Sequence, residues 1–238
     1  MKFTRLMAAA AMVMPLAALP GVAHAEDADE EASGPIDISA EVGVFSDYRF
    51  RGISLSGKDP EVTASLSIEH ESGLYASAWV SNVDLGTGSA DDVEIDWTAG
   101  FSTDVGAVNL DAGVIYYQYP GNGSFNYVEF YGAVGTKVGP ADVKVGVAYA
   151  PRQDNIGGLD NTYVYIAGEL PIGDGPLSLH GQFGIEDGAF GDAKRDWLIG
   201  ASFDLGSGFT ASADYVDTAR SYTTAGDPTV VVSLKKSF

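Results

Sequence analysis

The sequence predicts an all-β fold: a transmembrane antiparallel up-and-down β-barrel of about 12 strands, with short periplasmic turns and longer outer loops. Three observations predict it. Apolar and polar residues alternate with a period of two over most of the chain after residue 35, as they do in strands. The connections between the alternating runs are long and short in turn. The composition, with 30 Gly, 12 Tyr, 11 Phe and no Cys, is typical of many strands and turns.

The N-terminal residues have the features of a signal peptide. Lys2 and Arg5 precede an apolar stretch over 6–19, and Ala23-His24-Ala25 is a small-residue cleavage site. The apolar stretch is shorter than the ~20 residues of a membrane-spanning helix. The predicted organisation is a cleaved signal peptide at 1–25, an acidic flexible leader at 26–35 and an outer-membrane barrel at 36–238.

The alternating runs predict the strands directly. Ile36, Ile38 and Ala40 alternate with Asp37 and Ser39 in the first run, and later runs repeat the pattern. The predicted strands are roughly 36–50, 60–71, 74–84, 92–103, 107–119, 126–138, 141–150, 161–170, 176–186, 195–205, 208–217 and 228–238. In 74–84 and 161–170 either set of alternate residues could face outward, so the phase of these two strands is left open.

The connections favour a barrel over a sandwich. Long connections are predicted at 52–59, 85–91, 120–125, 151–160, 187–194 and 218–227, and short ones at 72–73, 104–106, 139–140, 171–175 and 206–207. A barrel of successive hairpins has this order, because its periplasmic turns are short and its outer loops long. Both ends of the domain then lie on the short-turn side. A soluble sandwich with Greek-key crossings has no reason to keep this order.

The two faces of the strands indicate what surrounds them. The polar face carries too many carboxylates for a dry core, because burying unpaired carboxylates is costly. We therefore expect the apolar face to meet lipid and the acidic face to line a lumen, in a closed barrel that pairs every backbone group. A soluble lipocalin-like barrel or sandwich is the alternative.

The stretch Ser46-Asp47-Tyr48-Arg49-Phe50-Arg51-Gly52-Ile53-Ser54 ends the first run. With a period of two, Tyr48 and Phe50 share a face with Val44 and are predicted at the outer lipid interface. Asp47, Arg49 and Arg51 then point into the barrel mouth. Aromatic residues near other strand ends indicate two interfacial girdles, with Tyr116, Tyr149 and Tyr215 toward the long loops and Phe101, Phe209 and Phe238 toward the short turns.

Residues 46–56 also carry a family resemblance. With the alternating, glycine-rich strands and the terminal Phe238, Asp47-Tyr48-Arg49-Phe50-Arg51-Gly52-Ile53-Ser54 resembles the D-Y-x-F-R-G-x-S signature of the TorF-type porin family. This resemblance covers the chain after residue 25 and implies an outer-membrane β-barrel without naming a solute. The last strand, 230–238, resembles the C-terminal signal by which the outer-membrane assembly machinery recognises barrels.

The predicted lumen is acidic, and this suggests a function. An acidic lumen favours cations over anions. We expect a porin-like barrel for passive passage of small solutes, with a preference for cations. The alternative is a non-conducting structural or adhesion-type barrel whose charges pair and plug the lumen. The residues predicted to contact a solute in the lumen or at the mouth are Asp47, Arg49, Arg51, Glu94, Asp96 and Asp111. For Arg49 and Arg51, a structural clamp on neighbouring carboxylates is an equally open reading.

Enzyme, metal and nucleic-acid functions find little support. After residue 25 the histidines are His70 and His180, and there is no Gly-x-Ser-x-Gly motif, so an outer-membrane hydrolase, the third alternative, has no recognisable triad. No metal-ligand spacing is present, and we expect no catalytic residue, metal or cofactor. The net charge of −20 argues against nucleic acid. Expected partners are outer-membrane lipid, the assembly machinery through Phe238 and small solutes; an oligomer is compatible with the sequence. The expected location is the outer membrane of a Gram-negative bacterium.

Overall fold

The computed structural model describes residues 35–86 and 92–238. The predicted signal peptide (1–25) and the predicted leader (26–35), except for its last residue, lie outside the described residues. Within the described part of the chain, no helix is long and apolar enough to cross a membrane.

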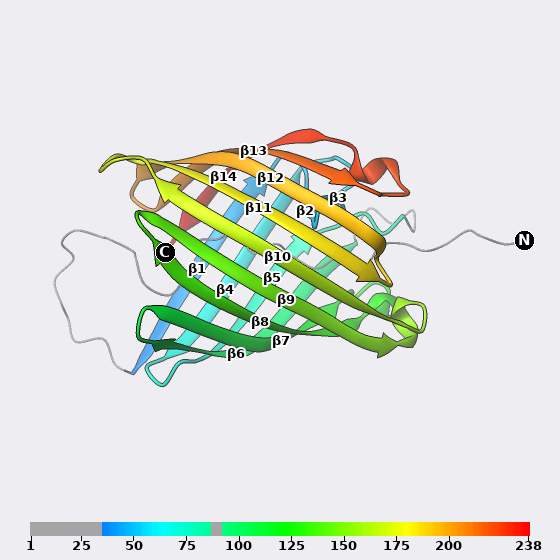
Figure 1. Cartoon of the computed structure of the whole chain (residues 1–238). Helices are drawn as coiled ribbons and strands as arrows, with labels where there is room; N and C mark the ends of the chain where they lie inside the picture. Colours follow the sequence, from blue (N-terminus) through cyan, green and yellow to red (C-terminus); the bar gives the residue numbers. More distant parts are fainter. Residues whose placement is uncertain (1–34, 87–91) are drawn as a thin grey trace, which may run out of the picture.

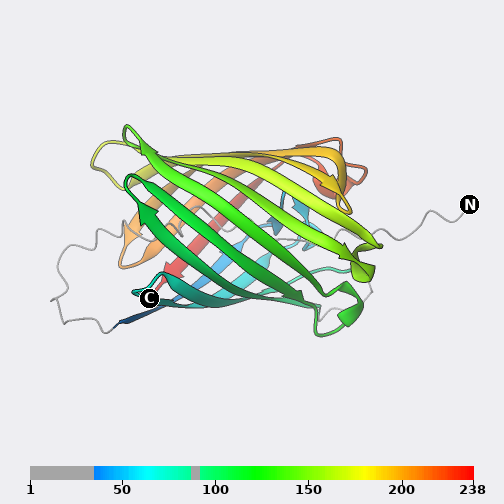
Figure 2. The same ribbon diagram turned by 60° about the horizontal axis from the view of Figure 1, so that its bottom comes forward.

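Twelve antiparallel strands form a closed barrel, as predicted (Figures 1 and 2). Each strand pairs with the next along the chain, and β1 pairs with both β4 and β14, which closes the sheet. The barrel strands are β1 (Ile36–Phe45), β4 (Glu61–His70), β5 (Leu74–Asn82), β6 (Val93–Val105), β7 (Val108–Gln118), β8 (Tyr127–Val138), β9 (Ala141–Gln153), β10 (Leu159–Pro171), β11 (Leu177–Gly188), β12 (Gly191–Gly206), β13 (Phe209–Ala219) and β14 (Thr229–Ser237).

Two further short strands do not belong to the barrel sheet. β2 (Arg49–Phe50) and β3 (Ile53–Ser54) pair only with each other and lie within the outline of the barrel (Figure 1). The predicted first strand, 36–50, therefore ends in the barrel at Phe45. Three 3-10 turns are described in the long loops: η1 (Gly123–Phe125), η2 (Asp154–Ile156) and η3 (Thr224–Gly226).

The outer face of the barrel is apolar, as the alternation predicts. Val44 and Val134 are about half exposed and Ile199 is 66% exposed, whereas acidic residues of the opposite face are buried inside. The structure also fixes the two strands whose phase the sequence left open. Leu74 of β5 and Val164 of β10 face outward, and their odd-numbered tyrosine neighbours face the lumen. Six of the eight aromatic residues predicted at the two membrane interfaces are exposed on this outer face: Tyr116, Tyr149, Tyr215, Phe101, Phe209 and Phe238.

The two ends of the barrel differ in their connections, as predicted. The short turns are 71–73, 106–107, 139–140, 172–176 and 207–208, and the first and last described strands begin and end beside them. One predicted long loop, 187–194, is wrong. β11 and β12 continue into this segment and leave only Ala189 and Phe190 between them, because the pairing of Glu186 with Lys194 extends the ladder past a bulge.

Tyrosines on the lumen face lie over glycines on neighbouring strands. Tyr131 of β8 is the direct cross-strand partner of Gly113 of β7, and the pairs Tyr75–Gly100 and Tyr165–Gly146 repeat the arrangement. A Cβ on Gly113 would lie 2.6 Å from Cζ of Tyr131, so the ring fills the space that a side chain would take. The glycines therefore make room for rings that pack flat against the inner wall.

Candidate functional site in the barrel lumen

The stretch after β1 turns inward and forms a tight hairpin. In this hairpin, defined here as residues 46–56, Arg49 pairs with Ser54 and Phe50 with Ile53. The two turn residues, Arg51 and Gly52, have φ values of 44° and 82°. Two consecutive residues with positive φ are the requirement of a type I′ hairpin turn, which glycine meets freely and arginine does not. The backbone of Arg51 is therefore held in place by its surroundings.

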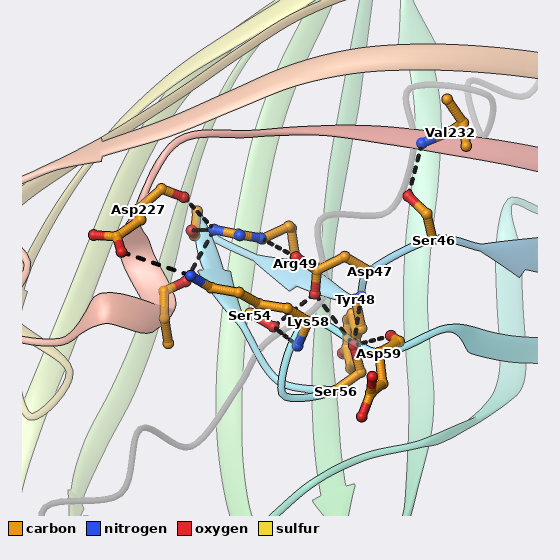
Figure 3. Close-up of polar contacts among 12 residues, drawn as sticks. Ser46, Asp47, Tyr48, Arg49, Ser54, Ser56, Lys58, Asp59, Asp227 and Val232 are labelled. Carbon is orange, nitrogen blue, oxygen red and sulfur yellow. Dashed lines mark hydrogen bonds and ion pairs between the residues drawn. The ribbon is translucent and has the colours of Figure 1, made fainter.

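Asp47 organises the base of the hairpin (Figure 3). Its Oδ2 accepts a hydrogen bond from Nε of Arg49 at 2.6 Å, and its Oδ1 accepts one from the Ser54 hydroxyl at 2.6 Å. Nη1 of Arg49 donates to the carbonyl oxygens of Gly52, Ala225 and Asp227 at 2.9–3.0 Å. These hydrogen bonds join residues of the hairpin to one another and to the loop between β13 and β14.

The apolar residues of the hairpin are buried inside the barrel. Tyr48 is 4% and Phe50 3% exposed. Both were predicted at the outer lipid interface, and that prediction is wrong. The chain leaves the barrel wall after Phe45, so the alternation of β1 no longer decides which way these rings point. With Ile53 and Leu55 they belong to an internal apolar cluster that also contains Val83, Tyr117, Tyr119, Tyr127, Ala150, Ile156 and Ala189.

The tip of the hairpin is clamped to the opposite wall. Nη2 of Arg51 lies 2.7 Å from Oε2 of Glu129 on β8, and Nη1 lies 2.7 Å from Oε1 of Glu186 on β11. The side chains of all three residues are at most 3% exposed. Lys194 on β12 donates a hydrogen bond from Nζ to the carbonyl oxygen of Arg51 at 2.9 Å. Burial by itself would lower the pKa of Arg51, but Glu129 and Glu186 raise it well above its usual value, so the guanidinium stays charged.

Gly52 allows the tip to approach the wall closely. A Cβ at this position would overlap the hydroxyl of Thr218 on β13 and would lie 2.9 Å from Cβ of Asp196 on β12. Tyr48, at the other end of the hairpin, packs against Trp79 of β5 with ring centroids 5.5 Å apart. The hairpin thus contacts both the early and the late strands of the barrel.

The inner wall around the hairpin is rich in buried carboxylates. Most have hydrogen-bond donors: Tyr119 donates to Glu94 at 2.7 Å, and Tyr163 donates to Asp196 at 2.9 Å. Asp96 is 2% exposed, and neither of its oxygens has a hydrogen-bond partner within residues 35–86 and 92–238. The buried acids of this wall are Glu61, Glu94, Asp96, Glu129, Glu186 and Asp196.

A cavity of about 470 Å³ occupies the lumen beyond the hairpin tip. It extends from Arg51 to the turn residues 71–73 at the short-turn end. Asp111 lines the cavity, accepts a hydrogen bond from the Tyr75 hydroxyl at 2.6 Å and lies 3.8 Å from Nζ of Lys144. Tyr75, Tyr117, Tyr131, Tyr163 and Tyr165 give the cavity an aromatic lining.

The structure separates the six predicted solute contacts into three groups. Asp47 and Arg49 bind each other at the hairpin base, and Arg51 binds wall carboxylates. Both arginines therefore make the ion pairs expected of a structural clamp. Glu94 and Asp96 lie buried on β6, and Asp111 lies in the cavity. Contact of any of the six with a solute stays a prediction.

Sequence reasoning missed the pairing of Arg51 with Glu129 and Glu186 and the tyrosine lining. The partners lie 78 and 135 residues from Arg51, too far for any local pattern to join them. A usable signal for the hairpin was present, because Arg51-Gly52 is flanked by the alternating apolar residues Phe50 and Ile53.

His180, considered for a hydrolase, belongs to a polar network. Its Nε2 lies 2.5 Å from Oδ1 of Asp214, and the Ser212 hydroxyl binds the other oxygen of Asp214 at 3.3 Å. A catalytic serine would have to bind the imidazole, with the carboxylate on the far side. Within the described part of the chain, no group of three or more His, Cys, Asp or Glu residues is arranged to hold a metal ion.

Comparisons with known proteins agree with the fold. A family model described as "Bacterial protein of unknown function (Gcw_chp)" matches residues 29–238. No curated protein matches the chain. A structure described as "KdgM porin" has 8% identity and a TM-score of 0.61, covering 84% of this chain and 99% of that one. A NanC porin structure has 11% identity and a TM-score of 0.55, covering 84% and 98%.

A third structure, described as the COG4313 outer membrane channel from Pseudomonas putida F1, has 11% identity and a TM-score of 0.52, and covers 89% of this chain and 100% of that one. At these identities the likeness shows the barrel fold alone.

Proposed function

Because the chain belongs to the Gcw_chp family, whose description assigns no activity, we propose a function from its own lumen: a porin-like barrel for passive passage of small solutes, with a preference for cations. The barrel would lie in the outer membrane of a Gram-negative bacterium, exported by the signal peptide at 1–25. Its long-loop end would face outward.

The exterior supports the membrane location. An apolar outer band with aromatic residues toward both ends suits a bilayer, and a closed sheet leaves no unpaired edge in lipid. The fold likeness to porins and the resemblance of 46–56 to the TorF-type signature support the same proposal. Phe238, exposed at the end of β14, would be the residue that the assembly machinery reads.

The observation that carries the proposal is the cavity itself. A space of about 470 Å³ inside an apolar-coated barrel, lined by both charged and aromatic side chains, is large enough for a small solute. Its lining includes the acids Glu69, Glu71 and Asp104 near the short turns. The two cations of the lining, Arg51 and Lys144, each lie beside carboxylates. The excess negative charge would concentrate cations in the lumen and repel anions.

The hairpin obstructs the lumen, and this supports the alternative of a non-conducting barrel. It lies between the cavity and the long-loop end and packs against strands on several sides of the barrel. In this conformation it is a plug, so passage of a solute requires the hairpin to shift. The same packing supports the alternative of a non-conducting structural or adhesion-type barrel with a filled lumen. Neither reading includes a catalytic step.

Recording in planar bilayers separates the two readings. The full-length protein is compared with a variant in which 47–58 is replaced by a short Gly-Ser turn. Phe45 and Glu61 are direct partners of β1 and β4, so a shortened connection joins strand ends that are already adjacent. Reversal potentials in a KCl gradient report charge selectivity.

We expect low or intermittent conductance from the full-length protein and a steady, cation-selective conductance from the shortened variant. Absence of conductance from both proteins would contradict the channel proposal and support the non-conducting structural barrel. Anion selectivity would overturn the cation preference. Heat-modifiable migration on a gel verifies that each protein has formed a barrel before recording.

A further inference from the structure

The surroundings of Arg51 form a binding site that belongs to the barrel wall. Glu129 on β8, Glu186 on β11 and Tyr163 on β10 are named here the carboxylate pocket. The two carboxylates each approach a different terminal nitrogen of the guanidinium at 2.7 Å, and the Tyr163 ring centroid lies 4.3 Å from Cζ of Arg51. Two acceptors in the plane of the cation and an aromatic face above it are the features that recognise a guanidinium group.

The carboxylate pocket is held in shape by wall residues and not by the hairpin. Tyr117 donates a hydrogen bond to Oε2 of Glu129 at 3.1 Å, and Asn161 donates one to Oε1 of Glu186 at 3.0 Å. The Tyr163 hydroxyl is fixed by Asp196 at 2.9 Å. None of these three contacts involves the hairpin, so we expect them to keep the pocket in shape for a cation when Arg51 is absent.

Without Arg51, the carboxylate pocket carries the charge of one unneutralised carboxylate. Lys194 lies 2.5 Å from Oε2 of Glu186 and neutralises that carboxylate. Without Arg51, the negative charge of Glu129 would remain buried and uncompensated, which is costly. Oε1 of Glu129 also has no hydrogen-bond partner among the described residues, so the pocket keeps an unused acceptor even with Arg51 in place.

The carboxylate pocket borders the cavity through two of its three residues. Glu129 and Tyr163 line the cavity that extends to the short-turn end, as do Arg51 and Tyr117, whereas Glu186 does not. Arg51 therefore lies at the boundary between the hairpin and the open part of the lumen. A small cation that entered the cavity could approach Glu129 directly and would reach Glu186 only by displacing Arg51.

We propose that the carboxylate pocket is a recognition site for guanidinium-bearing solutes, which Arg51 occupies as an internal substitute for the ligand. This inference deepens the proposed function, because solute access depends on the lumen being open to small molecules. It names the substrate class as small organic cations with a planar guanidinium group. An alkylammonium ion carries the same charge but lacks the planar fork that places one N–H on each carboxylate.

The test uses Arg51→Gly in the full-length protein in detergent micelles. Glycine suits the positive φ of residue 51, so the change empties the pocket and keeps the turn. Binding of ethylguanidinium chloride is measured by calorimetry and by the shift in unfolding temperature. Ethylammonium chloride tests the charge alone, and ethylurea tests the planar shape without the charge.

We expect ethylguanidinium to bind Arg51→Gly saturably and to raise its unfolding temperature. Ethylammonium should bind about tenfold more weakly and ethylurea not measurably, because only the guanidinium supplies both charge and fork. The natural protein should bind ethylguanidinium more weakly than the variant, since Arg51 holds the pocket. Adding Glu129→Gln to Arg51→Gly should abolish the binding. Lys58→Ala, which removes a cation from an exposed pair with Asp227, should leave the weak binding of the natural protein unchanged.

Equal effects of ethylguanidinium and ethylammonium, or no saturable effect, would overturn the inference. If Arg51→Gly loses heat-modifiable migration, the variant with the shortened 47–58 connection exposes the same pocket and is used instead. Binding is measured without conductance, so the two proposals fail separately. A barrel that conducts and does not bind refutes only the guanidinium site, and one that binds and does not conduct refutes only the channel.

Discussion

The ring of Tyr131 occupies the space that a side chain on Gly113 would need. The two residues are direct partners on β8 and β7, and a Cβ on Gly113 would also lie 2.6 Å from the carbonyl oxygen of Ala99. The Tyr131 hydroxyl in turn contacts the Tyr75 hydroxyl, whose ring covers Gly100 in the same way. On the lumen wall, tyrosine rings thus cover glycines of the neighbouring strand, and the tyrosines of two such pairs contact each other.

Gly113→Ala should therefore destabilise the barrel. The added methyl group meets both a tyrosine ring and a backbone carbonyl, and overpacking of this kind costs about 1–3 kcal/mol of the free energy of unfolding. Denaturant unfolding in micelles measures the change. Gly132→Ala is the matched control, because a Cβ there would lie 3.8 Å from its nearest neighbour, the carbonyl oxygen of Asp111. Equal stabilities of the two variants would contradict the packing argument.

Glu129→Gln should destabilise the protein strongly. It removes one of the two buried partners of the Arg51 guanidinium, and breaking a buried ion pair costs about 3–5 kcal/mol. The unfolding temperature of the variant reports the loss. Glu69→Gln serves as the comparison, since Glu69 also lines the cavity but is exposed. A similar small loss in both variants would show that the clamp contributes little to stability.

Arg49→Ala should loosen the base of the hairpin while the barrel stays closed. The change removes the ion pair with Asp47 and the hydrogen bonds to the carbonyls of Ala225 and Asp227. Hydrogen bonds to a charged group contribute about 1.5–3 kcal/mol each, so local opening becomes easier. Hydrogen exchange of the 48–56 amides should become faster, with exchange in β8–β12 unchanged.

Lys58→Ala is the control for this hairpin experiment. Lys58 lies 3.6 Å from Asp227, but both side chains are about half exposed, and exposed pairs contribute little. Its exchange should match that of the unaltered protein. Faster exchange across the whole barrel in Arg49→Ala would mean that the hairpin and the wall open together, against the prediction.

Trp97 and Trp79 should respond differently to a quencher placed in lipid. Trp97 is 50% exposed on the outer face, whereas Trp79 packs against the internal apolar cluster beside Tyr48. In single-tryptophan variants reconstituted in brominated lipid, fluorescence of Trp97 should be quenched and that of Trp79 largely retained. Quenching by iodide in water with no effect of brominated lipid on Trp97 would argue against a membrane-embedded outer face.

The sequence predicts the barrel well because a strand's alternation and its connections are local properties. Ile199 and Val44 identify the outer face from their own neighbours, and the closed twelve-stranded sheet follows from the order of turns. The same locality explains the error at Tyr48 and Phe50. Tyr48 and Phe50 keep the phase of Val44, but this phase contains no information about which sheet a strand joins.

The site was less predictable for a related reason. Glu129 and Glu186 resemble the other inward acids of their strands, and only the fold shows that Arg51 bridges them. The loop expected at 187–194 failed because its Gly and Asp residues are typical of turns, whereas the pairing of Glu186 with Lys194 continues the ladder. Contacts across the barrel depend on register and curvature, which no single strand encodes.

The hairpin can make all its contacts only in a complete barrel, because of its position in the chain. It forms directly after the first strand, but the groups that neutralise and enclose its tip come from β8, β11, β12 and β13, all in the later half of the sequence. A chain that stopped before β11 would leave the Arg51 guanidinium without Glu186 and without the wall around Gly52. The hairpin, which follows the first strand, can therefore reach its final contacts only when the later strands are present. A truncated barrel would have an unneutralised arginine in its interior.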